Sequence, residues 1–284
     1  MASEQIAANL TLINWTVLTG LALGSYAAVV LLRWRTPATK GFLAFTAVCA
    51  ALFGLLAWAS DGGITGVASG SPITGDPAFD GARRIALAAF SVLAIVTAGA
   101  VLRGGAARIA GTLGLAAGAA VLVLGALTWG GGAVGTVALF IQLLALAAAT
   151  GGVFAGMILG HWYLVTPKLP EAPLIALSRV LLGVVAVQAG LFVLWLATSA
   201  GPGAGGPDGG DGPFSALVGP WALFVWLRLF IGLVFPLVIT WAAVQTARSR
   251  SMESATGLLY IDVGAIAAGT ILAAGLYFGA GLLV

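Results

Sequence analysis

The sequence predicts an all-α polytopic membrane protein with eight transmembrane helices. Three observations carry this prediction: a very apolar composition, eight long apolar runs, and basic residues gathered in alternate connections. Of the 284 residues, 61% are hydrophobic and 7% are charged, whereas a soluble globular domain carries about 25% charged residues. Too few polar side chains remain to cover a water-soluble surface, and the mean hydropathy of +1.11 agrees. Lipid is therefore the expected solvent for most of the chain.

The apolar runs are long enough for helices and too long for the strands of a membrane barrel. A spanning helix needs about 20 apolar residues, and a barrel strand has about 10 residues of alternating polarity. The runs are uniformly apolar and cover residues 8–32, 41–60, 84–103, 108–129, 135–162, 173–199, 216–246 and 255–283. We therefore expect eight transmembrane helices joined by short connections.

Charged residues in the connections predict the orientation. The basic connections, which join helices 1–2, 3–4, 5–6 and 7–8, carry Arg33, Arg35, Lys40, Arg103, Arg108, Lys168, Arg248 and Arg250. The opposite side carries the acidic residues Glu4, Asp61, Asp76, Asp80, Asp208 and Asp211, with only Arg83 and Arg84 against the trend. The positive-inside rule then places both termini outside the cell. We expect a multi-pass protein of the inner (cytoplasmic) membrane.

A single integral membrane domain over residues 1–284 is expected, with a candidate division into parallel four-helix repeats, 1–130 and 131–284. Helix 1 ends in Arg33-Trp34-Arg35-Thr36-Pro37, and helix 5 ends in His161-Trp162-Tyr163 before Thr166-Pro167. A parallel repeat relates its halves by an axis along the membrane normal. The spacing between matching positions drifts along the chain, so the chemistry shared by helix boundaries explains the likeness equally well.

Helix 5 carries three glycines on one face, Gly152, Gly156 and Gly160, because residues four apart lie one above the other on a helix. Small residues let neighbouring helices approach closely in lipid. We therefore expect this ridge to serve helix packing. Similar pairs occur at Gly20/Gly24, Gly114/Gly118 and Gly275/Gly279.

On the inner side, five residues form a candidate polar pocket: His161, Tyr163, Arg179, Tyr260 and Asp262. Arg179 and Asp262 are expected at similar depths, about 10 Å from the inner ends of helices 6 and 8 at 1.5 Å per residue. An intramembrane charge is costly and usually faces a partner or a water-filled cavity. We expect an Arg179–Asp262 pair, either as a structural ion pair or within a binding cavity. His161, the only histidine, is either an interfacial side chain, a proton acceptor or an axial ligand to haem.

On the outer side, Arg83, Arg84 and Arg228 are candidate contacts for an anion or a lipid phosphate, since guanidinium groups bind such groups well. The alternative for Arg228 is that its side chain snorkels to the interface. Pro236, later in the same helix, lacks an N–H and should free the carbonyl of Gly232.

Several classes of function are disfavoured by the sequence. The basic residues form no stripe typical of nucleic-acid binding, and one cysteine with one histidine cannot build a metal cluster; His161 would ligate a metal only within a haem. No phosphate-binding loop or zinc-protease motif is present, so an enzyme is disfavoured. Asp262 is the only clearly intramembrane acid, which argues against a proton pump or an ion-coupled transporter, since these normally need a relay of buried acids.

The sequence favours a non-catalytic integral membrane subunit of a larger inner-membrane complex, of respiratory or other electron-transfer type. Sparse candidate catalytic residues, short connections and glycine ridges suggest helix faces that accept partners. The alternatives are a carrier or exporter of a small or amphipathic anion and a single-histidine haem protein. The expected partners are the lipid bilayer and either other membrane proteins or further copies of the chain.

Overall fold

The computed structural model is a bundle of eight membrane-spanning helices and describes residues 2–64, 66–166, 168–203 and 212–284. Asp208 and Asp211, used above for orientation, lie outside the described residues. A short helix precedes the spans. In order the helices are α1 (Ala2–Ala8), α2 (Leu10–Arg35), α3 (Lys40–Asp61), η1 (Pro77–Phe79), α4 (Asp80–Arg103), α5 (Ala107–Trp129), α6 (Ala133–Val165), α7 (Ala172–Thr198), η2 (Ser215–Leu217), α8 (Ala222–Leu229), η3 (Phe230–Val234), α9 (Phe235–Arg248) and α10 (Met252–Ala280).

The predicted all-α, eight-span architecture is confirmed, and the predicted spans agree closely with the observed helices. The seventh span is the one that departs from a regular helix. It consists of α8, a π-helical turn (η3) and α9. In the π-helical turn the N–H of Phe235 bonds the carbonyl of Phe230, five residues back.

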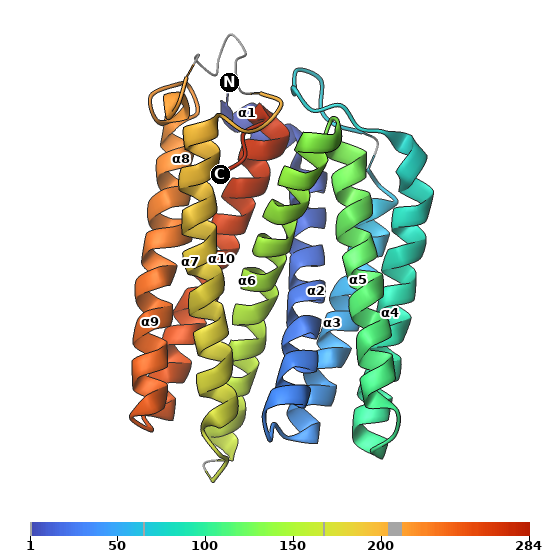
Figure 1. Cartoon of the computed structure of the whole chain (residues 1–284), viewed down its shortest axis with the longest axis vertical. Coiled ribbons are helices and arrows are strands. Elements are labelled where there is room, and N and C mark those ends of the chain that lie inside the picture. The colour runs from blue at the N-terminus through green and yellow to red at the C-terminus, as the bar shows by residue number, and fades with distance from the viewer. Residues whose placement is uncertain (1, 65, 167, 204–211) are drawn as a thin grey trace.

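The helices form two groups of four that meet along one central seam (Figure 1). In the first ring, α2, α3, α4 and α5 pack on one another in chain order. In the second ring, α6 packs on α7, α7 on α9, α9 on α10, and α10 returns to α6. The seam between the rings is the packing of α2 on α6, the most extensive helix pair in the described chain. Whether the halves are a sequence repeat stays a prediction.

Glycines explain how closely α2 and α6 approach. A Cβ built on Gly24 would lie 1.8 Å from the carbonyl oxygen of Ala147, and one built on Gly151 would lie 2.1 Å from the amide nitrogen of Ser25. Neither position can hold a side chain unless the backbones move apart. Gly20 and Gly24 were expected to pack closely, whereas Gly151 lies beside the predicted ridge and was not singled out.

The predicted ridge on α6 also contacts other helices. Gly160 lies against Thr256 of α10, where an added Cβ would be 2.7 Å from its hydroxyl oxygen. Gly156 faces Leu259 of α10, and Gly152 faces Leu181 of α7, both at an ordinary 3.6 Å. The ridge therefore receives side chains from the second ring, and the closest backbone approach occurs one residue away from it.

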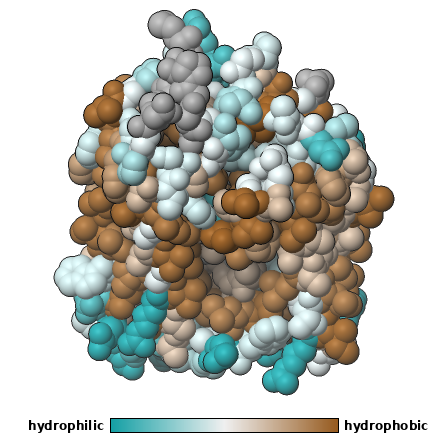
Figure 2. Space-filling view, turned by 45° about the horizontal axis from the view of Figure 1, so that its top comes forward, coloured by the Kyte–Doolittle hydropathy of each residue, from teal (hydrophilic) through white to brown (hydrophobic). Residues whose placement is uncertain are grey.

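On the face shown in Figure 2, an apolar band crosses the middle of the bundle, and polar residues gather toward its two ends. Both termini lie at one end, as an even number of spans requires (Figure 1). We call this the outer side, following the predicted orientation. The connections that carry Arg33, Arg103 and Arg250 lie at the opposite, inner end.

Candidate functional site

Two ionisable side chains, Arg228 and Asp262, are buried within the second ring, and neither has an oppositely charged partner among the residues that the structure describes. Arg228 on α8 is 1% exposed, and Asp262 on α10 is 0% exposed. No ion pair that the structure describes includes either residue. Intramembrane charges are costly and are the usual mark of a functional site in a membrane protein. These two residues therefore define the candidate site.

The guanidinium of Arg228 is held by neutral groups. Its Nη2 donates to Oε1 of Gln188 on α7 at 2.8 Å, and its Nη1 donates to the carbonyl of Gly232 at 3.2 Å. Its Nε is buried and has no hydrogen-bond partner. Gln188 is fixed in turn, because its Nε2 donates to the carbonyl of Ala145 on α6 at 2.7 Å. Three helices thus orient one positive charge inside the bundle.

The free carbonyl of Gly232 follows from the sequence. Pro236 has no N–H, so it cannot bond the carbonyl four residues earlier. The predicted vacancy is present, and Arg228 of the same span fills it. Gly269 on α10 leaves room for this arrangement, since a Cβ there would lie 2.8 Å from Nη1 of Arg228 and 2.5 Å from Cα of Gly232. A side chain at position 269 would displace the guanidinium.

The carboxyl group of Asp262 lies closer to the inner end of the bundle than Arg228 does. Asp262 precedes Gly269 by seven residues on α10, a separation of about 10 Å along the helix axis. Both carboxyl oxygens are buried, and neither has a hydrogen-bond partner. A native buried carboxyl is normally hydrogen-bonded or paired. Asp262 is therefore a buried carboxyl group to which the described side chains supply neither a hydrogen bond nor an opposite charge.

Two further buried hydroxyls lie in the same inner half of the ring. Thr240 on α9 lies eight residues after Gly232, and Asp262 on α10 lies seven residues before Gly269, the residue that contacts Gly232. Because α9 and α10 run antiparallel, Thr240 and Asp262 lie at similar depths. Its hydroxyl donates to the carbonyl of Pro236 at 2.7 Å. Ser178 on α7 is 1% exposed, and its hydroxyl has no partner. The interior thus carries polar groups at two levels, around Arg228 and around Asp262.

The predicted inner pocket does not assemble as expected. Arg179 is exposed on the outward face of α7 and makes no ion pair with Asp262, so the expected pair is absent. The reason is helix phase: the neighbouring Ser178 takes the inward position, and Arg179 turns away from the ring. Depth was inferred from sequence, but the direction of each side chain depends on packing.

The remaining inner candidates serve the ends of helices. His161 is exposed, and its Nδ1 lies 3.3 Å from the hydroxyl of Tyr260, which is 46% exposed. Tyr163 is buried, and its hydroxyl donates to the carbonyl of Pro170 in the following connection. A polar cavity of about 370 Å³ lies nearby, lined by Tyr163, Leu164, Arg250, Ser251, Met252 and Glu253. Asp262 is not part of it.

His161 does not fit a buried haem. A haem in a bundle needs an apolar cavity beside its axial ligand, and both His161 and its partner Tyr260 lie at the surface. Within the described residues, no group of three or more His, Cys, Asp or Glu side chains could hold a metal ion. We therefore derive no chemistry through a metal or a haem.

The outer arginines do not form one cluster, because Arg83 and Arg84 lie on α4 in the first ring and Arg228 lies on α8 in the second. Arg83 is 1% exposed and donates to both oxygens of Asp61, at 2.7 and 3.2 Å, and to Asp80 at 2.9 Å. It also donates to Thr128 and lies against the rings of Trp15 and Trp129. These contacts join all four helices of the first ring.

Arg83 is therefore engaged within the protein, contrary to the expected anion contact. Arg84 lies 5.3 Å over the ring of Trp58. Arg228 belongs to the second ring and does not snorkel, because it is buried and bonded to Gln188. Of the three arginines, Arg228 is the one whose buried charge is left without a carboxylate.

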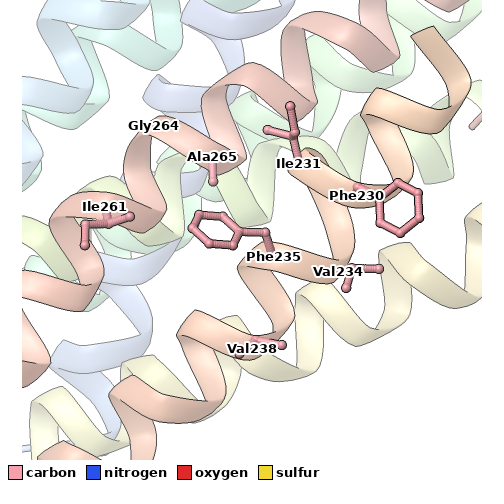
Figure 3. Close-up of a pocket in the computed structure, with 8 residues that line it drawn as sticks. All are labelled: Phe230, Ile231, Val234, Phe235, Val238, Ile261, Gly264 and Ala265. Atoms are coloured by element: carbon pink, nitrogen blue, oxygen red, sulfur yellow. The ribbon is translucent and has the colours of Figure 1, made fainter. Parts of the chain in front are cut away.

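An apolar groove borders the same two elements on the lipid-facing side. It has a volume of about 720 Å³ and is lined by Phe230, Ile231, Val234, Phe235, Val238, Ile261, Gly264 and Ala265. Figure 3 shows five of these side chains on the η3–α9 segment and three residues on α10. The seventh span and α10 thus touch through glycines inside the ring and leave a gap on the lipid side.

Sequence reasoning identified Arg228 and Asp262 but missed their surroundings. Gln188 and Ser178 were indistinguishable from other polar residues in apolar helices. One local signal was present in the sequence: Pro236 frees the carbonyl of Gly232, and Arg228 lies on the same span four residues before that glycine.

Comparison with protein-family models, with curated proteins and with solved structures found no match to this chain.

Proposed function

We propose that the protein is a carrier that moves a small or amphipathic anion across the membrane and binds it at Arg228. The observation that carries the proposal is a fully buried guanidinium held by an amide oxygen and a carbonyl, with no carboxylate and with Nε free. A buried charge needs a counterion or a hydrated cavity. Guanidinium groups favour carboxylate, phosphate and other oxyanions.

The seventh span supports movement around this site. Its π-helical turn and Pro236 interrupt the regular helix next to Arg228, and such interruptions are common at functional sites and at bends. Gly232 and Gly269 meet backbone to backbone, and the side chain of Arg228 lies against both glycines, so a movement of the span against α10 would act directly on the anion site. The apolar groove shows that few side chains interlock on the lipid side.

Uptake by proteoliposomes tests the proposal. Purified protein is reconstituted and supplied with chloride, as a small anion, or octanesulfonate, as an amphipathic anion that stays charged. Wild type is expected to accumulate at least one of them. Arg228→Gln should abolish uptake, because the amide keeps hydrogen bonding but removes the charge. Arg84→Gln is the matched control and should transport normally. Equal uptake by wild type and Arg228→Gln would refute the assignment.

Membership in a larger complex stays a prediction, supported by sparse candidate catalytic residues and by the apolar side chains on the lipid-facing surface of the helices. Purification from the native membrane in a mild detergent tests it. Stoichiometric co-purification of other membrane subunits would support the complex, and migration of the chain alone would count against it. An absorbance spectrum of the same preparation tests haem: the absence of a Soret band removes that prediction.

A further inference from the structure

Asp262 is a buried acid that the proposed anion site leaves unused. It lies on α10, the helix whose Gly269 contacts Arg228, and is about 10 Å from Gly269 along the helix axis. Both of its oxygens lack a partner, as does the hydroxyl of Ser178 in the same inner half of the ring. A carboxyl that forms no bond within the protein is poorly explained as a structural element.

The charged groups on neighbouring elements do not satisfy Asp262. The elements packed on α10 contribute Glu4 on α1, Tyr26, Arg33 and Arg35 on α2, Arg228 on α8, His161 and Tyr163 on α6 and Arg248 on α9. Glu253, Tyr260 and Tyr277 lie on α10 itself. None of them bonds or pairs with Asp262 in the described structure. Arg228 is the one cation among them that is buried inside the ring.

We propose that Asp262 binds the proton that accompanies the anion, so that the carrier moves one proton with each anion. This inference rests on the proposed binding of an anion at Arg228. With neither solute bound, Arg228 and an ionised Asp262 carry no net charge. With both bound, the anion neutralises Arg228 and the proton neutralises Asp262. Either solute alone leaves one unbalanced charge inside the membrane.

Charge balance makes the coupling strong. If the axial separation of about 10 Å stands for the distance between the two charges, and the effective dielectric constant is near 20, loss of one charge disfavours the half-loaded state by about tenfold or more. The proton comes from water on one side, joins a carboxylate oxygen of Asp262 and leaves to water on the other side. One acid is enough here, because a carrier exposes the same group to each side in turn. A relay of several buried acids is needed only where the proton travels alone.

The test follows net anion uptake, proton uptake and anion exchange in the same proteoliposomes, with a pH-sensitive dye inside. For wild type, a chloride or octanesulfonate gradient should acidify the lumen as the anion enters. Asp262→Asn is neutral at every pH. The variant with the anion bound at Arg228 therefore has no net charge at the site, whereas the variant without the anion has one unbalanced positive charge. Asp262→Asn should lose lumen acidification and net uptake by about tenfold or more, and keep exchange of labelled for unlabelled anion.

Glu253→Gln is the matched control, an acid-to-amide change at the exposed inner end of the same helix, and should keep proton uptake. Anion uptake by wild type without lumen acidification would overturn the proposal, as would normal acidification by Asp262→Asn. Loss of exchange as well as net uptake in a folded Asp262→Asn variant would also overturn it, because the residue would then be needed for anion binding itself.

A second measurement separates this proposal from the anion site. Infrared difference spectra of wild type against Asp262→Asn detect the carbonyl stretch of a protonated carboxylic acid. We expect this band in folded wild type, and its conversion to carboxylate bands as the pH rises. Absence of the band at every pH that keeps the fold would overturn proton binding. Presence of the band in a protein that transports neither anion would refute the anion carrier and the coupling, and leave Asp262 as a proton site.

Discussion

Replacing Arg83 with Met should destabilise the bundle strongly, because it leaves Asp61 buried without a partner. The Arg83 and Asp61 side chains are each 1% exposed and joined by two hydrogen bonds. Removing one member of a buried pair costs about 3–5 kcal/mol. The contact with Asp80, which is 47% exposed, adds less than about 1 kcal/mol. Methionine retains most of the packing against the tryptophans, so we expect a total loss of about 4–5 kcal/mol.

The free energy of unfolding is measured by SDS titration in mixed micelles, with the reactivity of Cys49 on α3 as the readout. Cys49 is partly buried, so a thiol reagent reports separation of the first ring. The double variant Arg83→Met/Asp61→Asn should be more stable than Arg83→Met by about 2–3 kcal/mol, because an amide tolerates burial better than a carboxylate. Arg84→Met is the control and should cost less than about 1 kcal/mol. A loss for Arg83→Met no larger than for Arg84→Met would refute the reasoning.

Three further predictions follow from packing and orientation. Gly24→Ala should lower the free energy of unfolding by about 3 kcal/mol or more, or prevent folding, because its Cβ would lie 1.8 Å from a carbonyl oxygen of α6. Gly183→Ala is the control and should be neutral, because no atom lies near position 183. Size-exclusion profiles distinguish the two variants, and equal profiles would contradict the close packing of α2 on α6. Arg228→Met should cost about 1–2 kcal/mol by SDS titration, less than Arg83→Met, because it strands two neutral acceptors but removes a buried charge; a larger loss would show that Arg228 is mainly structural. In a cysteine-free background, Ala78→Cys should react with a membrane-impermeant maleimide on intact cells and Ser249→Cys only after lysis, and the reverse result would invert the orientation.

Helix number and depth could be read from the sequence because hydropathy is a local property. In a bilayer every span must bury about 20 apolar residues and satisfy its backbone internally, so run lengths translate directly into helices. Pro236 likewise had a local consequence, the free carbonyl of Gly232, which the structure contains. The sequence offered no equivalent signal for the π-helical turn at residues 230–234.

Pairing of charges could not be read in this way. Arg179 and Asp262 occupy similar depths, yet Arg179 faces outward and Asp262 faces the interior. Arg83 appeared to be an exception to the charge pattern of the outer side, and it is in fact the centre of a buried network with Asp61. A helix turns by about 100° per residue, so one position of phase reverses the environment of a side chain, and phase depends on which helices pack together.

The amino-acid sequence by itself determined the solvent of this protein, its helical class and its eight crossings, because these follow from apolar run length in lipid. Tertiary structure alone decided the two four-helix rings, the glycine seam of Gly24 with Gly151 and the isolation of Arg228 and Asp262. The physical reason is that lipid tails are as apolar as the helix surfaces, so hydrophobicity does not choose partners among the helices. Close packing of small residues and a few polar contacts make that choice, and they bring together residues far apart in the chain.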